Sequence, residues 1–250
     1  MLHFIFRDHG LNSPTLEVFI ISWKGQHDNA ISIAHAIQEA VQYVHIIYSD
    51  PDPSFELIAS CKSTKRPNEL MWADKFKACL DECHSDLMLV IQADTYCQDW
   101  PLLARKCYLT MSTNPLVGVW APLIDHTPFH VNFTNIAMID QTSLCIVAQT
   151  DGIIFCLSSD IINRMRQVNY ADNILGWGID WLFVTHAFST GKLAVVDISV
   201  LAKHRISRGY DNISAEKLML NFLNQNLNIP EFSQYTTLQS HIMIPKNAVF

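Results

Sequence analysis

Three side chains in this sequence have the chemistry expected of a reactive site. Asp94 closes an apolar run, and Asp180 follows a Gly-Trp-Gly loop at 176–178. His204 comes some two dozen residues after Asp180. A carboxylate can accept a proton or bind a cation, and a neutral imidazole is a common metal ligand. If the fold brings these residues to one cleft, they could support general-base or metal-assisted chemistry.

The stretch 173–204 has the pattern of a loop, a buried helix, a turn and a strand. Asp180 lies at the expected helix start, where an acidic side chain suits the positive end of the helix dipole. Gly191 fits the left-handed conformation that commonly ends a helix. Residues 192–200 then read as a strand with two faces. One face is expected to carry Ala194, Val196, Ile198 and Val200, and the other Asp197 and Ser199.

The first half of the chain has the pattern of a parallel βαβ unit followed by a second helix and strand. Residues 16–22 and 44–48 are apolar runs typical of strands buried on both faces, and residues 30–41 between them have helical periodicity. A helix is expected at 69–83, and the next strand ends in the segment 92–94. Ligands of such sheets bind beyond the carboxyl ends of the strands. The sequence has neither a dinucleotide-binding fingerprint nor a P-loop.

The second half is expected to contain two further helices and three further strands. Helices are predicted at 100–113 and 161–168, and strands at 116–121, 143–148 and 152–157. Residues 122–141 have few clear signals and are expected to form loops.

Composition excludes several classes of protein. The chain has 250 residues, of which 49% are hydrophobic and 16% charged, so it can bury a large core. A net charge of −7 without a basic cluster argues against a nucleic-acid surface. No apolar run approaches the ~20 residues of a membrane span. Seven scattered cysteines without a paired spacing predict reduced thiols, and the start lacks the basic lead of a signal peptide. These features favour a cytoplasmic protein, with peripheral attachment to a membrane left open.

The order of these elements resembles GT-A-fold glycosyltransferases, most closely inverting enzymes with a (W)GxED-type motif. The resemblance covers roughly residues 15–210 and rests on the segment 176–180, on the DXD-like segment 92–94 and on His204. Ile179 stands where the family usually carries a second acid, and Gln92 replaces the first acid of the DXD motif.

The fold implied by this resemblance is α/β: a mostly parallel, twisted, Rossmann-like sheet flanked by helices. Residues 16–210 would form a single catalytic domain. Residues 1–15 would be an N-terminal lead-in, and residues 211–250 a C-terminal helix and tail.

The activity implied by the resemblance is transfer of a sugar from a nucleotide-diphosphate sugar to an acceptor hydroxyl, with inversion. Asp180 would be the catalytic base, and Asp94 and His204 would hold a divalent metal, Mn²⁺ or Mg²⁺. The positions that would contact the nucleotide sugar are Ser22, Trp23, Asp50, Lys75, Gln92 and Asp94. The positions that would lie near the sugar or acceptor are Asp151, Trp177 and Gly178. A loop at 205–211 could close over the diphosphate.

Partners implied by this resemblance are a nucleotide-sugar donor and a glycan, lipid-linked or protein acceptor, with no nucleic acid. Two other functions stay open. A nucleotidyltransferase on a related fold also uses a metal and acids, but it usually carries a glycine-rich basic loop, of which residues 23–25 are a poor version. A non-catalytic nucleotide-sugar-binding protein is favoured by Gln92 and Ile179. Taken singly, Asp50 could merely end a strand, Lys75 could be a solvated lysine, and His204 a surface histidine.

Overall fold

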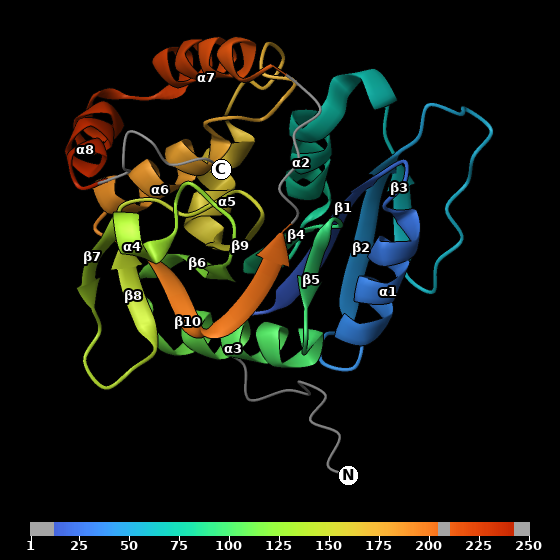
Figure 1. The fold of residues 1–250 in the computed structure, drawn as a ribbon, viewed down its shortest axis with the longest axis horizontal. Coiled ribbons are helices and arrows are strands. Elements are labelled where there is room, and N and C mark those ends of the chain that lie inside the picture. Colours follow the sequence, from blue (N-terminus) through green and yellow to red (C-terminus); the bar gives the residue numbers. More distant parts are fainter. Residues whose placement is uncertain (1–12, 205–210, 243–250) are drawn as a thin grey trace.

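The computed structural model describes residues 13–204 and 211–242. In this part of the chain, a ten-stranded sheet has helices on both faces, which makes a three-layer α/β domain (Figure 1). The strands are β1 (Leu16–Trp23), β2 (Tyr43–Ser49), β3 (Lys62–Lys65), β4 (Leu87–Gln92), β5 (Thr95–Cys97), β6 (Val117–Ile124), β7 (Asn135–Met138), β8 (Leu144–Val147), β9 (Ile154–Ser158) and β10 (Leu193–His204). The helices are α1 (His27–Ile37), α2 (Met71–Glu82), α3 (Trp100–Thr113), α4 (Val131–Thr134), α5 (Ser159–Arg166), α6 (Ile179–Ser189), α7 (Asn212–Asn226) and α8 (Ile229–Ser240), with a 3₁₀ turn at Asn68–Leu70.

The first four strands of the sheet order form its parallel half. The order is β3-β2-β1-β4-β9-β6-β10-β8-β7, and β5 pairs with β10 beside this path. Strands β3, β2, β1 and β4 are paired in parallel. The predicted strands at 16–22 and 44–48 are confirmed, because an uninterrupted apolar run buries both faces of a parallel strand. The α/β fold class with a central sheet flanked by helices is therefore confirmed.

Helices cover the two faces of the sheet with separate hydrophobic cores. Val18 and Ile20 of β1 pack in the core that contains α1 and α3. Phe19 and Ile21 point to the opposite face and pack in the core that contains α2, α5 and α6. The last two helices, α7 and α8, contribute buried side chains to this second core, and Figure 1 shows them in red at the same end of the molecule as α5 and α6.

Antiparallel strands in the second half bring distant loops together. Strand β9 lies between β4 and β6 and is antiparallel to both. The chain entering β9 therefore runs beside the chain leaving β4, and the backbone amide of Gln92 donates to the carbonyl of Ile153 at 2.9 Å. Strand β5 is antiparallel to the end of β10 and pairs Thr95 with His204. Both pairings place loop residues of opposite halves of the chain at one edge of the sheet.

Strand β10 corrects the expected division of residues 192–200 into two faces. Asp197 is buried, at 1% exposure, whereas Ile198 is 42% exposed. The cause is a register shift between Asp197 and Leu201 relative to β6, which breaks the alternation. The buried Asp197 carboxylate is satisfied, because it accepts hydrogen bonds from the Ser143 hydroxyl and from the amide and hydroxyl of Ser199.

Several short elements lie where no regular structure was expected. Strand β3 lies within the segment 51–68, and α4 and β7 lie within 122–141. The tail after residue 228 contains α8, which begins with a capping box between Asn228 and Glu231. These elements are short or weakly periodic, so they depend on contacts with the sheet or with α6 rather than on a local pattern.

The described helices include none with both the length and the apolar character needed to cross a membrane. All seven cysteines lie in the described part of the chain, and all are free thiols.

Candidate active site

The Asp94 and His204 side chains meet at the edge of the sheet where β4 and β10 end. The imidazole Nε2 of His204 lies 3.2 Å from Oδ2 of Asp94. The other oxygen, Oδ1, is buried and has no hydrogen-bond partner among the described residues. A buried carboxylate oxygen without a partner is costly unless a ligand completes it. This pair was predicted from sequence, and the structure brings its members into contact.

Two residues that sequence reasoning missed hold this pair in place. The Asn29 side chain of α1 donates to the carbonyls of Ala93 and Thr95, on either side of Asp94. Asp125, which follows β6, accepts the backbone amide of His204 at 2.9 Å. Asp125 carries the same sequence signal as Asp94, an acid directly after a buried strand. Asn29 carries no comparable signal, because its role depends on where α1 lies.

Acidic side chains surround His204. Burial by itself would lower the pKa of His204, but the hydrogen bond to Asp94 and the charges of Asp94, Asp151 and Asp125 outweigh it and raise the pKa. Asp151 enters this group from the loop before β9, and the Thr127 hydroxyl donates to its carboxylate. The edge of the sheet is therefore a region of negative potential that favours a cation.

Asp180 lies in the first turn of α6, as predicted. The backbone amide of Trp181 donates to its Oδ1 at 2.9 Å. Burial and, after it, the charge of Asp151 raise the pKa of Asp180 to about 7. The side chain also lies near Gly152, where a Cβ atom would stand 3.8 Å from the Cβ of Asp180. A carboxylate with this pKa can exchange a proton at neutral pH.

The Gly-Trp-Gly loop owes its shape to two glycines. Gly176 and Gly178 have φ values of +79° and +86°, which favour glycine. A Cβ at Gly176 would overlap the Trp72 ring of α2, and one at Gly178 would stand 2.8 Å from Met219 of α7. Gly178 therefore packs against α7. Trp177 between them is half-buried, and its carbonyl accepts a hydrogen bond from the Asn173 side chain at 2.8 Å.

At the ends of β1 and β2, His27 joins two of the residues predicted to contact a nucleotide. Its Nδ1 lies 2.9 Å from the Ser22 hydroxyl, and its Nε2 lies 3.2 Å from Oδ2 of Asp50. Phe55 stacks on the His27 ring with 4.8 Å between centroids. The amide of Asp52 and, after it, His27 lower the pKa of Asp50, because both interactions favour the carboxylate. The role of His27 had no signal in the sequence.

The remaining predicted residues line the same end of the sheet. Lys75 is 3% exposed, and its ammonium donates to the Ser49 hydroxyl at 3.0 Å, so it is not a solvated lysine. Burial lowers the pKa of Lys75 to about 8. The side-chain amide of Gln92 donates a hydrogen bond to the carbonyl of Gly152 at 2.8 Å. Trp23 is half-buried and packs against the core that contains α2. The predicted loop at 205–211 lies outside the described residues except for Asp211, which caps α7.

Comparison of sequences gives no relatives: no family model matches the chain, and no curated protein matches it. Comparison of structures gives a fold. GalNAc-T7 with UDP, GalNAc and Mn²⁺ is similar with a TM-score of 0.66 and 10% identity, over 93% of this chain and 52% of GalNAc-T7. This chain thus spans about half the length of that protein.

Two further solved structures are similar over most of this chain. The mannosyltransferase PcManGT from Pyrobaculum calidifontis, with GDP-Man and Mn²⁺, has a TM-score of 0.58 and 12% identity, over 92% of this chain and 70% of its own. Glucosyl-3-phosphoglycerate synthase from Mycobacterium tuberculosis, with Mn²⁺, UDP-Glc and phosphoglyceric acid, has a TM-score of 0.59 and 12% identity, over 94% and 82%. At sequence identities this low, the structural similarity establishes a shared fold alone. The protein therefore has the GT-A fold that the resemblance implied.

Proposed function

We propose that this protein is a glycosyltransferase that moves a sugar from a nucleotide-diphosphate sugar to an acceptor hydroxyl, with inversion at the anomeric carbon. The observation that carries the proposal is the Asp94–His204 pair, with one carboxylate oxygen left unpartnered, on the same edge of the sheet as Asp180, whose pKa is raised to about 7 by burial. The GT-A fold supports it, because the similar structures named above contain nucleotides or nucleotide sugars together with Mn²⁺.

The residues present fit a divalent cation. Asp94 offers an unpartnered oxygen and His204 a ring nitrogen next to it, and oxygen with imidazole nitrogen suits Mn²⁺, with Mg²⁺ as a second choice. The described residues contain no group of three or more His, Cys, Asp or Glu side chains able to hold a metal. Two protein ligands with further positions for phosphate oxygens are common for cations that act on nucleotides. When bound, such an ion would neutralise the negative charge that develops on the leaving diphosphate.

The donor would lie across the ends of β1, β2 and β4. Lys75 supports this position, because a buried ammonium with a neutral hydroxyl partner is a ready site for a phosphate. The side chains at this end that would contact the nucleotide or its sugar are Ser22, Trp23, Asp50 and Gln92. Asp50 would act as a permanent acceptor, since its lowered pKa keeps it ionised.

Asp180 would take the proton from the acceptor hydroxyl while that oxygen attacks the anomeric carbon from the side opposite the leaving group. A general base works best when its pKa is close to the working pH, and burial brings the pKa of Asp180 to about 7. Trp177 would offer a ring face to the sugar, and Asp151 would accept hydrogen bonds from its hydroxyls. Gly178 would act through the loop shape, because it packs against Met219.

The test is a panel of UDP-, GDP- and CMP-linked sugars, each incubated with a mixture of simple glycoside acceptors and with Mn²⁺ or EDTA. We expect Mn²⁺-dependent release of one nucleoside diphosphate and formation of a glycoside whose anomeric configuration, read by proton NMR, is opposite to that of the donor. In a parallel incubation with a nucleoside triphosphate and a sugar phosphate, release of pyrophosphate would instead identify a nucleotidyltransferase. Tight nucleotide-sugar binding without any product would identify a binding protein. A product with the donor's configuration would refute inversion.

A further inference from the structure

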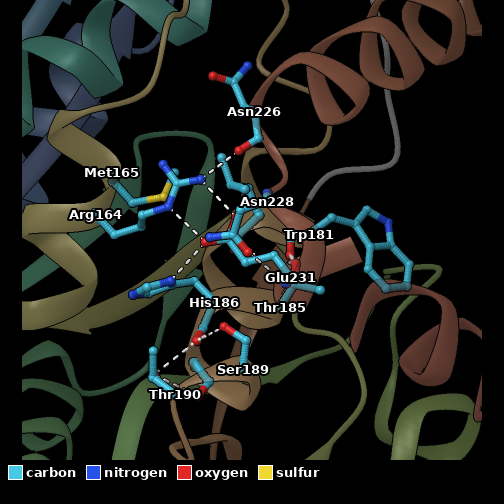
Figure 2. A network of polar contacts seen from close by, with 12 residues as sticks. Arg164, Met165, Trp181, Thr185, His186, Ser189, Thr190, Asn226, Asn228 and Glu231 are labelled. Carbon is cyan, nitrogen blue, oxygen red and sulfur yellow. Dashed lines mark hydrogen bonds and ion pairs between the residues drawn. The ribbon is translucent and has the colours of Figure 1, made fainter. Parts of the chain in front are cut away.

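A buried glutamate joins the C-terminal helix α8 to the helix that carries Asp180. Glu231 is fully buried, at 0% exposure. It accepts hydrogen bonds from Arg164 of α5 at 2.7 and 2.8 Å, and its Oε1 lies 2.9 Å from Nδ1 of His186 on α6 (Figure 2). The amide of Asn228 donates to its other oxygen at 2.9 Å. Every lone-pair direction of this carboxylate is thus directed at a fixed partner, which locks α8 onto α5 and α6.

The next turn of α8 places Tyr235 over the start of α6. Glu231, Tyr235 and Leu238 are the buried residues of α8 and share one face of the helix. The Tyr235 ring packs edge-on against Trp181, with 5.0 Å between ring centroids and 85° between the planes. Since Tyr235 meets the start of α6 while Glu231 meets its end at His186, α6 and α8 run antiparallel.

Tyr235 packs against Trp181, the residue that follows the proposed base in α6. Burial and, after it, the charges of Asp180 and Glu216 raise the pKa of the Tyr235 phenol, so the phenol lies within electrostatic reach of Asp180. Its hydroxyl accepts a hydrogen bond from the Gln239 side chain at 2.7 Å. Asp180 also lies near Gly152 and within reach of the charge of Asp151.

We propose that Tyr235, held by the Glu231 lock, is a positioning residue whose ring shields the Asp180 carboxylate from water. This inference rests on the proposed function for its catalytic meaning, but its structural content does not. Hydration stabilises the ionised carboxylate, so a ring that excludes water would keep the pKa of Asp180 raised. The groups that face Asp180 are the Trp181 amide on its own helix, Asp151 from the loop before β9 and Tyr235 from α8. Asp151 belongs to the loop before β9 and Tyr235 to α8, so a variant at Tyr235 tests the contribution of α8 separately.

The experiment is a carbon-13 NMR titration of the Asp180 carboxyl in protein labelled at aspartate, with the resonance assigned by its absence from Asp180→Asn. We expect Tyr235→Ala to lower the titration midpoint of Asp180 by on the order of one pH unit or more, because the carboxylate becomes hydrated. Tyr235→Phe keeps the ring and is expected to keep the midpoint within a few tenths of a unit of the parent. Phe232→Ala, at a side chain 53% exposed on the same helix, is the matched control.

A second variant guards against loss of the fold. If Tyr235→Ala does not fold, Tyr235→Gln replaces the ring by a polar chain that admits water, and the same lowering is expected. The acid limb of the kcat/KM profile should move with the NMR midpoint, while donor affinity stays at the parent value. A folded Tyr235→Ala or Tyr235→Gln variant with an unmoved Asp180 midpoint overturns the proposal. If the midpoint moves but no nucleotide sugar is consumed by the parent protein, the proposed function fails and the shielding role stands.

Discussion

The two ends of the proposed site treat their carboxylates in opposite ways. At the donor end, Asp50 is already engaged by the Asp52 amide and His27, and its pKa is lowered. At the catalytic edge, Asp180 accepts the amide of Trp181, and burial and the charge of Asp151 raise its pKa to about 7. The same functional group is therefore a fixed anion in one place and a proton acceptor in the other.

The opposite pKa shifts of Asp50 and Asp180 show that the surroundings of each carboxyl group set its role. Hydrogen bonds to the ionised form stabilise it, whereas burial and a neighbouring negative charge destabilise it. The acid at the donor end can hold a ligand without changing its charge, and the acid at the catalytic edge can change its charge during a reaction. Lys75 at the donor end departs from this pattern, because burial destabilises its charged form and lowers its pKa to about 8.

The substitution with the largest expected effect removes the proton acceptor at the catalytic edge. Asp180→Asn keeps the shape but cannot accept a proton, so kcat should fall by about 10²–10⁴-fold. Donor affinity should stay near the parent value, because the nucleotide would be held at the other end. Transfer rate, calorimetric donor affinity and Tm should be measured on one sample, with the exposed Asp172→Asn as the matched control. A folded variant that transfers sugar at the parent rate would remove Asp180 from the mechanism.

The second prediction concerns the lock that supports the catalytic edge. Burial alone would raise the pKa of Glu231, but the hydrogen bonds from Arg164 and His186 outweigh it and lower the pKa to about 2. Glu231→Gln removes one partner of a buried ion pair, which costs about 3–5 kcal/mol of stability.

The pH dependence of this loss follows from the sign of the shift. The pKa of about 2 lies below the ordinary value of 4.5, so the stabilisation is complete above about pH 4.5 and is lost as pH falls toward 2. Urea titrations at pH 7 and pH 3.5 should show a smaller difference between parent and variant at the lower pH. Glu39→Gln, an identical change at an exposed site, should be nearly neutral. A constant difference at both pH values would contradict the lock.

The third prediction tests the metal pair. Asp94→Asn removes the charge that would hold the cation, so stimulation by Mn²⁺ should fall by about 10²-fold, in line with the several kcal/mol that a bound metal supplies. Asp28→Asn, at an exposed carboxylate of α1, is the control for a lost negative charge. The readout besides activity is calorimetric Mn²⁺ binding in the presence of UDP or GDP. Metal binding unchanged by Asp94→Asn would show that the pair does not hold the ion.

The substitution with the smallest expected effect removes the buried lysine at the donor end. Lys75→Met should weaken binding of the nucleoside diphosphate by about tenfold, because a charge-assisted contact is lost. It should also stabilise the protein at pH 7 by on the order of 1–3 kcal/mol, because the buried charge is removed.

This gain should disappear at high pH. The pKa of about 8 lies below the ordinary value of 10.5, so the unfolded chain binds more protons between these values and the parent gains stability as pH rises through them. Lys77→Met, which changes a surface lysine of the same helix, should show neither effect. Unchanged diphosphate affinity in Lys75→Met would separate Lys75 from the donor.

Local pattern in the sequence was sufficient for the main elements. The apolar runs at 16–22 and 44–48 predicted parallel strands, and the helix predicted at 100–113 has those bounds in the structure. The position of Asp180 in the first turn of α6 and the left-handed Gly191 were also predicted. These features depend on periodicity and on turn chemistry, which act over a few residues and are therefore readable in one sequence.

Contacts between distant segments could not be read in the same way. The sequence predicted that Asp94 and His204 form a pair, but only the antiparallel pairing of β5 with β10 brings these residues, 110 positions apart, to 3.2 Å. No sequence pattern pointed to His27 or Asn29, because their contacts depend on how α1 packs against the loops that carry their partners. The bulge that buries Asp197 was hidden, since its register is set by β6.

The amino-acid sequence shows which aspartates are present, whereas the folded surroundings set the pKa of each and therefore its chemical role. An aspartate has one ordinary pKa in an unfolded chain, and only burial, hydrogen bonds and neighbouring charges change it. Those neighbours come from elements far away in the chain, such as the loop of Asp151 and the helix of Tyr235 beside Asp180. Residues 229–240 were expected to belong to a tail, but they form α8, which is joined to α5 and α6 through Glu231. The partners of Glu231 become adjacent only when the chain has folded, so this helix could not be predicted from the local sequence.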